Sequence, residues 1–162
     1  MVKKYIIRKI ASEIEKVSVA KELTADIRDI DRREILAVAE DVYQEILASM
    51  QLSDMCYVSR VCKDNKIIAV WGIRKIDGRS GRLIWCLGTP RLEKFWLSFA
   101  DKSKKIVTDW AKKYGVLFNA VGNFNKNSIR WLKWCGADFG KSVSVGKEKF
   151  IPFYIKGGGK NV

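Results

Sequence analysis

The sequence lacks the side chains on which several common kinds of catalysis depend. It contains no histidine, which excludes Ser-His-Asp and Cys-His catalytic groups. Its four cysteines form no Cys-x-x-Cys pair, so a zinc site would need all four thiolates. Two of them lie within apolar runs, where a cysteine usually packs as a small hydrophobic residue. We therefore expect no metal site and four reduced thiols in a cytosol-like compartment, at Cys56, Cys62, Cys86 and Cys135.

The charged residues are unevenly distributed along the chain. Thirty-one Lys and Arg stand against 18 Asp and Glu, which gives a net charge of +13. Residues 1–54 hold nine basic and eleven acidic residues, whereas residues 55–162 hold twenty-two basic and seven acidic ones. The second part should therefore attract anions such as nucleic acid, an acidic partner or the phosphates of a nucleotide cofactor. A basic surface that only keeps the protein in solution explains the lysines equally well.

At 162 residues the chain is long enough for one domain but too short for two with substantial cores. We expect a single domain over residues 1–156 and a flexible tail over residues 157–162, which is rich in glycine. No apolar run approaches the roughly 20 residues of a membrane span. The basic and then apolar N-terminus is too short for a signal peptide with a cleavage site.

Hydrophobic periodicity and turn residues predict the order of helices and strands. Ser12 and Glu15 have the spacing of a capping box, Asp64-Asn65 favours a hairpin turn, and Gly115 and Gly136 favour helix ends. The expected elements are a strand over 3–9, two helices within 11–48 broken near 23–26, strands over 56–62, 66–73 and 82–87, a helix over 98–114, a strand over 116–122, a helix over 127–135, and strands over 143–145 and 150–155.

This order predicts an α/β (α+β) fold with a mixed sheet of about seven strands and about four helices. Its pattern is β-α-α-β-β-β-α-β-α-β-β. A helix that connects two neighbouring strands makes them parallel, whereas tight turns connect antiparallel strands. The sheet should therefore contain a parallel pair at its centre, formed by the strands on either side of the helix over 98–114.

The order of elements resembles that of the GNAT N-acetyltransferases over essentially the whole chain. The most specific segment is NKNSIRWLKWCG, from Asn125 to Gly136. GNAT proteins often have an Asn, a small residue three positions on, an aliphatic residue next and a Gly eleven after the Asn. Here these places are held by Asn125, Ser128, Ile129 and Gly136. The resemblance implies a sheet whose two central parallel strands separate, here after Leu87, with acetyl-CoA bound in the opening.

A narrower resemblance is to a phage family that includes the internal virion protein A of short-tailed phages, a divergent branch of the GNAT superfamily. It is carried by a Gly-Thr pair after the fourth strand and by the segments DIRDIDRREI, LIWCLGTPRL, SFADKSKKIV and NSIRWLKWCGADF. This resemblance implies a phage-encoded protein of the host cytoplasm that associates with the virion. Its role would be virion assembly or acetyl transfer.

The GNAT resemblance also implies which residues hold acetyl-CoA (or CoA). A backbone amide near Leu87 or Gly88 would polarise the acetyl carbonyl. The phosphates would meet the N-terminal turn of the helix over 98–114, where the partial positive charge of a helix favours anions. Ser98 could instead be an ordinary N-cap. The implied cofactor-binding residues are Leu87, Gly88, Thr89, Ser98, Phe99, Ala100, Lys102 and Asn125.

Two departures from the GNAT pattern bear on mechanism. In the pyrophosphate loop, [Q/R]-x-x-G-x-[G/A], the three defining places are taken here by Phe95, Ser98 and Ala100. Where many GNAT enzymes have a Tyr that protonates the departing CoA thiolate, this chain has Leu132, which has no proton to give.

Transfer of an acetyl group to an amine also needs a base, or a path through water, because only the neutral amine is nucleophilic. Our first candidate for this base is Glu34, with Asp31 and Arg28 beside it in the sequence. The helix that carries them is amphipathic, and the same three polar residues could simply face water.

The six tryptophans allow two interpretations. On a basic surface they could stack on the bases of single-stranded nucleic acid. Their positions in strands and at core-like helical spacing favour packing in the core for most of them. They are Trp71, Trp85, Trp96, Trp110, Trp131 and Trp134.

The sequence thus supports two hypotheses. The first is an N-acetyltransferase in which an amine, such as a protein lysine or N-terminus, attacks acetyl-CoA directly. The second is a non-catalytic phage protein that binds DNA or a virion protein through its basic surface. Membrane association is expected in neither.

Overall fold

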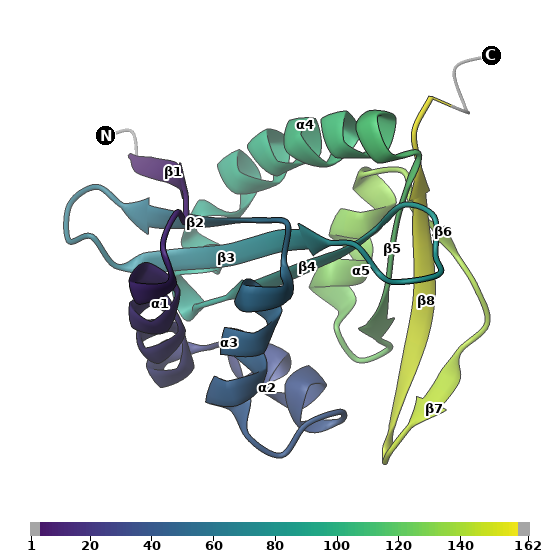
Figure 1. The fold of residues 1–162 in the computed structure, drawn as a ribbon, viewed down its shortest axis with the longest axis horizontal. Helices are drawn as coiled ribbons and strands as arrows, with labels where there is room; N and C mark the ends of the chain where they lie inside the picture. Colours follow the sequence, from purple (N-terminus) through teal and green to yellow (C-terminus); the bar gives the residue numbers. More distant parts are fainter. Residues whose placement is uncertain (1–3, 159–162) are drawn as a thin grey trace. The chain divides into compact units, whose positions relative to one another are not determined.

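The structure is a computed structural model that describes residues 4–158. Within these residues it contains eight strands, five α-helices and one 3-10 helix (Figure 1). In chain order they are β1 (Tyr5–Lys9), α1 (Glu13–Asp26), α2 (Asp29–Leu36), α3 (Val42–Leu52), β2 (Met55–Val61), β3 (Ile67–Arg74), β4 (Arg82–Gly88), the 3-10 helix (Pro90–Phe95), α4 (Trp96–Tyr114), β5 (Val116–Gly122), α5 (Lys126–Trp134), β6 (Asp138–Phe139), β7 (Val143–Val145) and β8 (Glu148–Lys156).

The strands form one mixed sheet in the order β1-β2-β3-β4-β5-β8-β6, and β7 pairs with β8. β4 and β5 are parallel, whereas β1–β2, β2–β3, β5–β8, β6–β8 and β7–β8 are antiparallel. The predicted mixed α/β fold with a parallel pair on either side of one long helix is therefore confirmed.

Three elements differ from the sequence prediction. Residues 11–48 were expected to form two helices, but α1 ends at Asp26. It is followed by Ile27 and Arg28, whose backbone is extended with ψ near 143° and 144°. α2 follows, and Asp41 then begins α3 by accepting a hydrogen bond from the Gln44 amide. β6 was not predicted, because its two residues are too few to show alternation.

The contacts among Cα atoms divide the chain into two compact units. Unit 1 consists of Met1–Arg74 and Trp85–Trp96, and unit 2 consists of Lys75–Ile84 and Leu97–Val162. β4 contributes its first three residues to unit 2 and the rest to unit 1. The single domain over residues 1–156 remains a prediction.

The flexible tail over residues 157–162 remains a prediction, and its first residue, Gly157, makes contacts within the described part of the chain. The Gly157 amide donates to the Gly115 carbonyl at 2.9 Å, and a Cβ at position 157 would lie 2.0 Å from the Ala111 carbonyl oxygen. Gly157 is thus packed into unit 2. The last four positions of the predicted tail, and the first position of the predicted strand over 3–9, lie outside the described residues.

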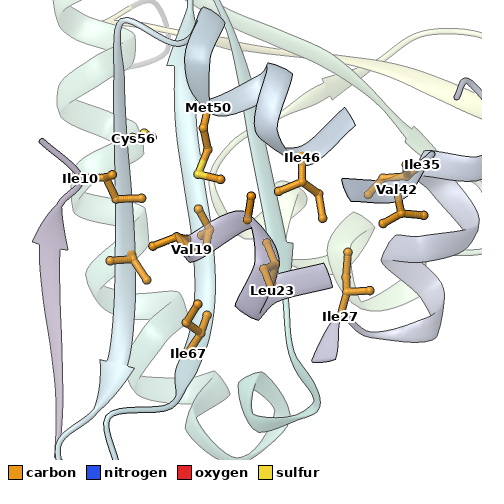
Figure 2. Close-up of a cluster of buried hydrophobic side chains, with 13 residues drawn as sticks. Ile10, Val19, Leu23, Ile27, Ile35, Val42, Ile46, Met50, Cys56 and Ile67 are labelled. Atoms are coloured by element: carbon orange, nitrogen blue, oxygen red, sulfur yellow. The ribbon is translucent and has the colours of Figure 1, made fainter. Parts of the chain in front are cut away.

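The core of unit 1 lies between α1–α3 and the strands β2 and β3 (Figure 2). Leu23, Ile46, Met50 and Ile67 have at most 1% of their surface exposed. Burying an aliphatic side chain of this size stabilises the fold by about 1.5–3 kcal/mol. The cluster consists of Ile10, Val19, Ala20, Leu23, Ile27, Ile35, Val42, Ile46, Met50, Cys56, Val58, Ile67 and Val70.

Unit 2 is built on the full-length pairing of β5 with β8, which runs from Val116 opposite Lys156 to Gly122 opposite Phe150. α4 buries Phe99, Val107 and Trp110. α5 packs beside α4, since the indole N–H of Trp131 donates to the Ser103 hydroxyl at 3.1 Å. No helix among residues 4–158 combines the length and the apolar character needed to cross a membrane.

Candidate functional site

The parallel pairing of β4 with β5 ends after two residues. Arg82 lies opposite Leu117 and Leu83 opposite Phe118, and the ladder stops there. Beside its end, the side-chain amide of Asn119 donates to the Ile84 carbonyl at 2.7 Å, while its oxygen accepts the Ala120 amide at 2.8 Å. A side chain thus replaces the next bond between the strands. The predicted separation after Leu87 is corrected to Leu83.

Asn119 is a residue that sequence reasoning missed. It is the one polar residue in the strand VLFNAVG, and a polar residue in an apolar run could have signalled a break in the ladder. Its two hydrogen bonds satisfy backbone groups that the separating strands would otherwise leave unpaired.

The far end of β4 is held to β3 by Thr89. Its amide donates to the Ile68 carbonyl at 3.0 Å, and its hydroxyl lies 2.8 Å from the Ile67 carbonyl and 3.2 Å from that of Ile68. The Thr89 side chain is fully buried. This hydroxyl is occupied inside unit 1. The contact of Thr89 with a cofactor remains a prediction.

The amides of β4 alternate in direction, which decides which of them a ligand could meet. The Thr89 amide points to β3, so the Leu87 amide, two residues earlier, faces β3 as well. The Gly88 amide points away from β3 but donates to Asp31 Oδ2 at 2.8 Å. The Cys86 amide faces the same side as that of Gly88. Of the amides near the predicted Leu87 and Gly88, that of Cys86 is the better candidate to polarise a carbonyl.

Asp31 and Arg28 form a buried ion pair against the end of β4. Arg28 Nε lies 2.8 Å from Asp31 Oδ2 and Arg28 Nη2 lies 3.0 Å from Asp31 Oδ1, with 12% and 2% of the two side chains exposed. The Arg28 amide also donates to the Gly88 carbonyl at 2.9 Å. A Cβ at position 88 would lie 3.0 Å from Arg28 Nε and 2.7 Å from Leu92 Cδ2, so any larger residue there would displace these two side chains.

The buried pairing of Arg28 with Asp31 changes the pKa of the Arg28 guanidinium. Burial lowers the pKa of the Arg28 guanidinium, but the charge and hydrogen bonds of Asp31, together with Cys86 and Glu34, outweigh it and raise that pKa above its ordinary value. Both oxygens of Asp31 accept hydrogen bonds. Asp31 is therefore a structural carboxylate. From the sequence alone it could equally have been a residue that faces water.

Glu34, the predicted base, is half-buried on α2 one turn after Asp31. Its negative charge contributes to raising the pKa of both Arg28 and Cys86, so it lies within electrostatic reach of both groups. The structure thus brings Glu34 close to the end of β4. Its role as a base remains a prediction.

Cys86 and Cys135 are poor nucleophiles. Burial raises the pKa of Cys86 to about 12, reinforced by the negative charge of Asp31. Burial also raises the pKa of Cys135 to about 12. Both thiols therefore stay protonated near neutral pH, and only a thiolate attacks readily. Among the described residues, no cluster of Cys, Asp and Glu could hold a metal ion.

The predicted phosphate-binding residues lie at the start of α4. The 3-10 helix runs directly into α4, which begins at Trp96 instead of the predicted Ser98. Ser98 is therefore in the first turn and is not the N-cap. Ser98 and Lys102 are exposed, Ala100 is half-buried and Phe99 is buried. Phe99 could meet a ligand only through its backbone.

Asn125, predicted to lie beside pantetheine, is the N-cap of α5. Its Oδ1 accepts the Ser128 amide at 3.3 Å, and only 1% of the residue is exposed. Leu132 is also buried. Capping and burial explain both positions without a ligand, so the contact of Asn125 with a cofactor remains a prediction.

Solved acetyltransferases share this fold over nearly their whole lengths. An acetyltransferase of the GNAT family from Bacillus anthracis matches with a TM-score of 0.62 at 16% identity, covering 95% of this chain and 96% of that one. The chain has the GNAT acetyltransferase fold.

Two ribosomal-protein acetyltransferases also have folds similar to that of this chain. The ribosomal-protein-S5-alanine acetyltransferase from Vibrio fischeri has a TM-score of 0.68 at 13% identity, covering 98% of this chain and 96% of its own. The ribosomal-protein-S18-alanine N-acetyltransferase from Escherichia coli has a TM-score of 0.66 at 11% identity, covering 98% and 99%. At such identities the likeness shows the fold alone.

No family model and no curated protein matches the sequence. The GNAT part of the sequence interpretation is therefore supported through the fold. The narrower resemblance to the phage family remains a prediction.

Proposed function

We propose that this chain is an N-acetyltransferase that uses acetyl-CoA. The observation that carries the proposal is the match of the whole fold to GNAT acetyltransferases. The early end of the β4–β5 ladder supports it, because the backbone of β4 from Cys86 onward takes no part in that pairing. When bound, acetyl-CoA supplies an acetyl group activated as a thioester.

Unit 2 has the charge needed to hold the phosphates of the cofactor. It carries sixteen basic and five acidic residues, a net charge of +11 out of the +13 of the whole chain. The first turn of α4 adds the partial positive charge of a helix N-terminus. In our proposal the backbone of Ser98, Phe99 and Ala100 and the Lys102 ammonium hold the diphosphate, and pantetheine passes Leu87, Gly88 and Asn125.

The groups we assign to the acetyl end come from β4 and α2. The Cys86 amide would donate a hydrogen bond to the acetyl carbonyl, which stabilises the negative charge that develops on its oxygen. Asp31 cannot serve as the base, because Arg28 and Gly88 occupy its oxygens. Glu34 is the remaining carboxylate near β4 on α2, and we assign it the proton of the substrate ammonium.

The reaction needs no covalent enzyme intermediate. The ammonium proton would pass to Glu34, the neutral nitrogen would bond to the acetyl carbon, and the carbon–sulfur bond would break to release the thiolate, while water takes the second proton that the nitrogen loses as it becomes an amide. The neutral thiol of Cys86 agrees with direct attack. Leu132 cannot protonate the leaving thiolate, so water would do so. The acceptor we favour is a protein amine, by analogy with the ribosomal-protein enzymes of the same fold.

The proposal is tested by calorimetry and by turnover. We expect acetyl-CoA to bind with a micromolar Kd, and Ser98→Glu to weaken it at least tenfold, because a carboxylate there repels the diphosphate. Glu93→Gln, at an exposed carboxylate of the 3-10 helix, is a matched surface control. Absence of binding at millimolar acetyl-CoA would refute the proposal.

For turnover, acetylation of peptide and polyamine mixtures is followed by chromatography, since exposed Cys62 would interfere with thiol reagents. Glu34→Gln should lower kcat by about 10²–10⁴-fold and leave acetyl-CoA affinity unchanged. Equal kcat for Glu34→Gln and wild type at every pH would remove Glu34 from the mechanism.

The basic charge of unit 2 also favours a second candidate function, the binding of an anionic partner. This was the role expected of a phage virion protein, and it does not exclude acetyl transfer. Binding of such a partner would require a defined surface on the protein.

A further inference from the structure

The exposed face of α5 is mostly basic and aromatic. Residues 126, 130, 133 and 134 fall within about a third of the helix circumference, since each residue advances by about 100°. All of them are exposed. No acidic residue occurs anywhere in α5. We define the α5 face as Lys126, Asn127, Arg130, Lys133 and Trp134.

Trp134 is unusual among the six tryptophans. Trp71 and Trp110 are buried, and Trp85, Trp96 and Trp131 are half-buried, which confirms core packing for most of them. Trp134 is 55% exposed. An aromatic ring that stays exposed among basic side chains offers a flat apolar surface on which a planar ligand group could stack.

Trp134 is held in place from one side. Lys104 of α4 places its ammonium 4.0 Å from the centre of the ring, which is a cation–π contact. The same ammonium acts on the pKa of Cys135, so it lies near the end of α5. One turn earlier, Trp131 donates to Ser103 and ties the two helices together. The Lys104 ammonium thus lies against one face of the ring, while more than half of the residue stays exposed.

We propose that the α5 face, with Lys104, binds single-stranded nucleic acid. Lys126, Arg130 and Lys133 would contact phosphates along about 10 Å of helix, given the roughly 1.5 Å rise per residue. A base would stack on the exposed part of Trp134, as aromatic residues on basic surfaces do in single-strand binding proteins. Duplex would bind more weakly, because its bases are already stacked on one another.

The two kinds of contact predict different responses in one experiment. Fluorescence anisotropy of labelled dT12 and rU12 is measured between 25 and 300 mM NaCl. Trp134→Ala should weaken binding roughly tenfold at every salt concentration, and Trp134→Tyr should restore most of it. Arg130→Ala should lower the slope of log K against log salt by about 0.7, the contribution of one phosphate contact on a single strand.

A matched control is Lys112→Ala. Lys112 is exposed on the same helix as Lys104 but eight residues, or about 12 Å, further along. It removes one positive charge without touching the α5 face, so affinity should change less than twofold. Circular dichroism checks that each variant is folded, which is expected because the substituted residues are exposed.

Three results would overturn the proposal. The first is equal affinity of wild type and Trp134→Ala. The second is a loss of oligonucleotide affinity in Lys112→Ala as large as in Arg130→Ala, which would mean that binding depends only on the overall positive charge. The third is full competition by CoA together with weaker acetyl-CoA binding by Trp134→Ala, which would assign the face to the cofactor. Acetyl-CoA binding unchanged in Trp134→Ala, with oligonucleotide binding lost, would support it independently of acetyl transfer.

Discussion

The buried pair of Arg28 and Asp31 should be the most sensitive polar contact of unit 1. Asp31→Ala removes the partner of a guanidinium whose side chain is 12% exposed, and it leaves the Gly88 amide without its acceptor. Breaking a buried ion pair from one side costs about 3–5 kcal/mol, and an unsatisfied buried amide about 1–3 kcal/mol. Because the two losses share one carboxylate, they are not additive, and we expect about 4 kcal/mol in total.

The assay is urea unfolding followed by circular dichroism. With a slope of about 2 kcal/mol per molar urea, Asp31→Ala should lower the midpoint by about 2 M. The control is Asp29→Ala, an exposed carboxylate in the first turn of the same helix. It loses only a favourable interaction with the helix dipole, which is worth less than about 1 kcal/mol.

A double mutant separates pairing from packing. Arg28→Met with Asp31→Leu removes both charges, so it should be less destabilised than the sum of the two single substitutions. The reasoning is refuted if Asp31→Ala costs no more than Asp29→Ala. It is also refuted if the double mutant equals the sum of the single losses.

Three further predictions follow from the described contacts. Cys86 and Cys135 titrate near 12 in the folded chain but near the ordinary pKa of 9.0 when unfolded, so their stabilising effect is intact below about pH 9 and is lost as the pH rises toward 12. The urea midpoint should fall less steeply over that window in a Cys86→Ala/Cys135→Ala variant than in wild type, and parallel curves would contradict this. Asn125→Ala removes a helix cap, so we expect a loss of about 1 kcal/mol and a Tm lower by roughly 2–4 °C in a thermal melt; an unchanged Tm would contradict the capping role. At neutral pH a thiol reagent should modify exposed Cys62 first, identified by mass spectrometry, and rapid labelling of Cys86 would mean that β4 opens.

Local chemistry in the sequence was sufficient for most element boundaries. Gly115 and Gly136 were expected to end helices, and both adopt positive φ, 87° and 86°. Asn65, expected in the hairpin turn, is the one non-glycine residue with positive φ among the described residues. Ser12 caps α1 by accepting the Glu15 amide, as its spacing predicted. Each of these features depends on residues within a few positions of one another, and such patterns are visible in a sequence.

The contacts that shape the candidate site were harder to predict from the sequence. Asp31 meets the Gly88 amide across 57 positions, and no local pattern distinguishes such a carboxylate from one that faces water. The resemblance selected Asn125 and Thr89 for a cofactor, whereas the structure uses their side chains as a helix cap and as a link between strands. The direction of each amide in β4 depends on its pairing partner, so the choice of Cys86 over Leu87 required the structure.

A crystal structure with acetyl-CoA tests the central claim most directly. The account predicts the acetyl oxygen at about 3 Å from the Cys86 amide, which is hydrogen-bond distance for a carbonyl-polarising donor. It also predicts the diphosphate at the first turn of α4, beside Ser98. A cofactor bound elsewhere, or an acetyl group remote from β4 in a fully occupied complex, would contradict it.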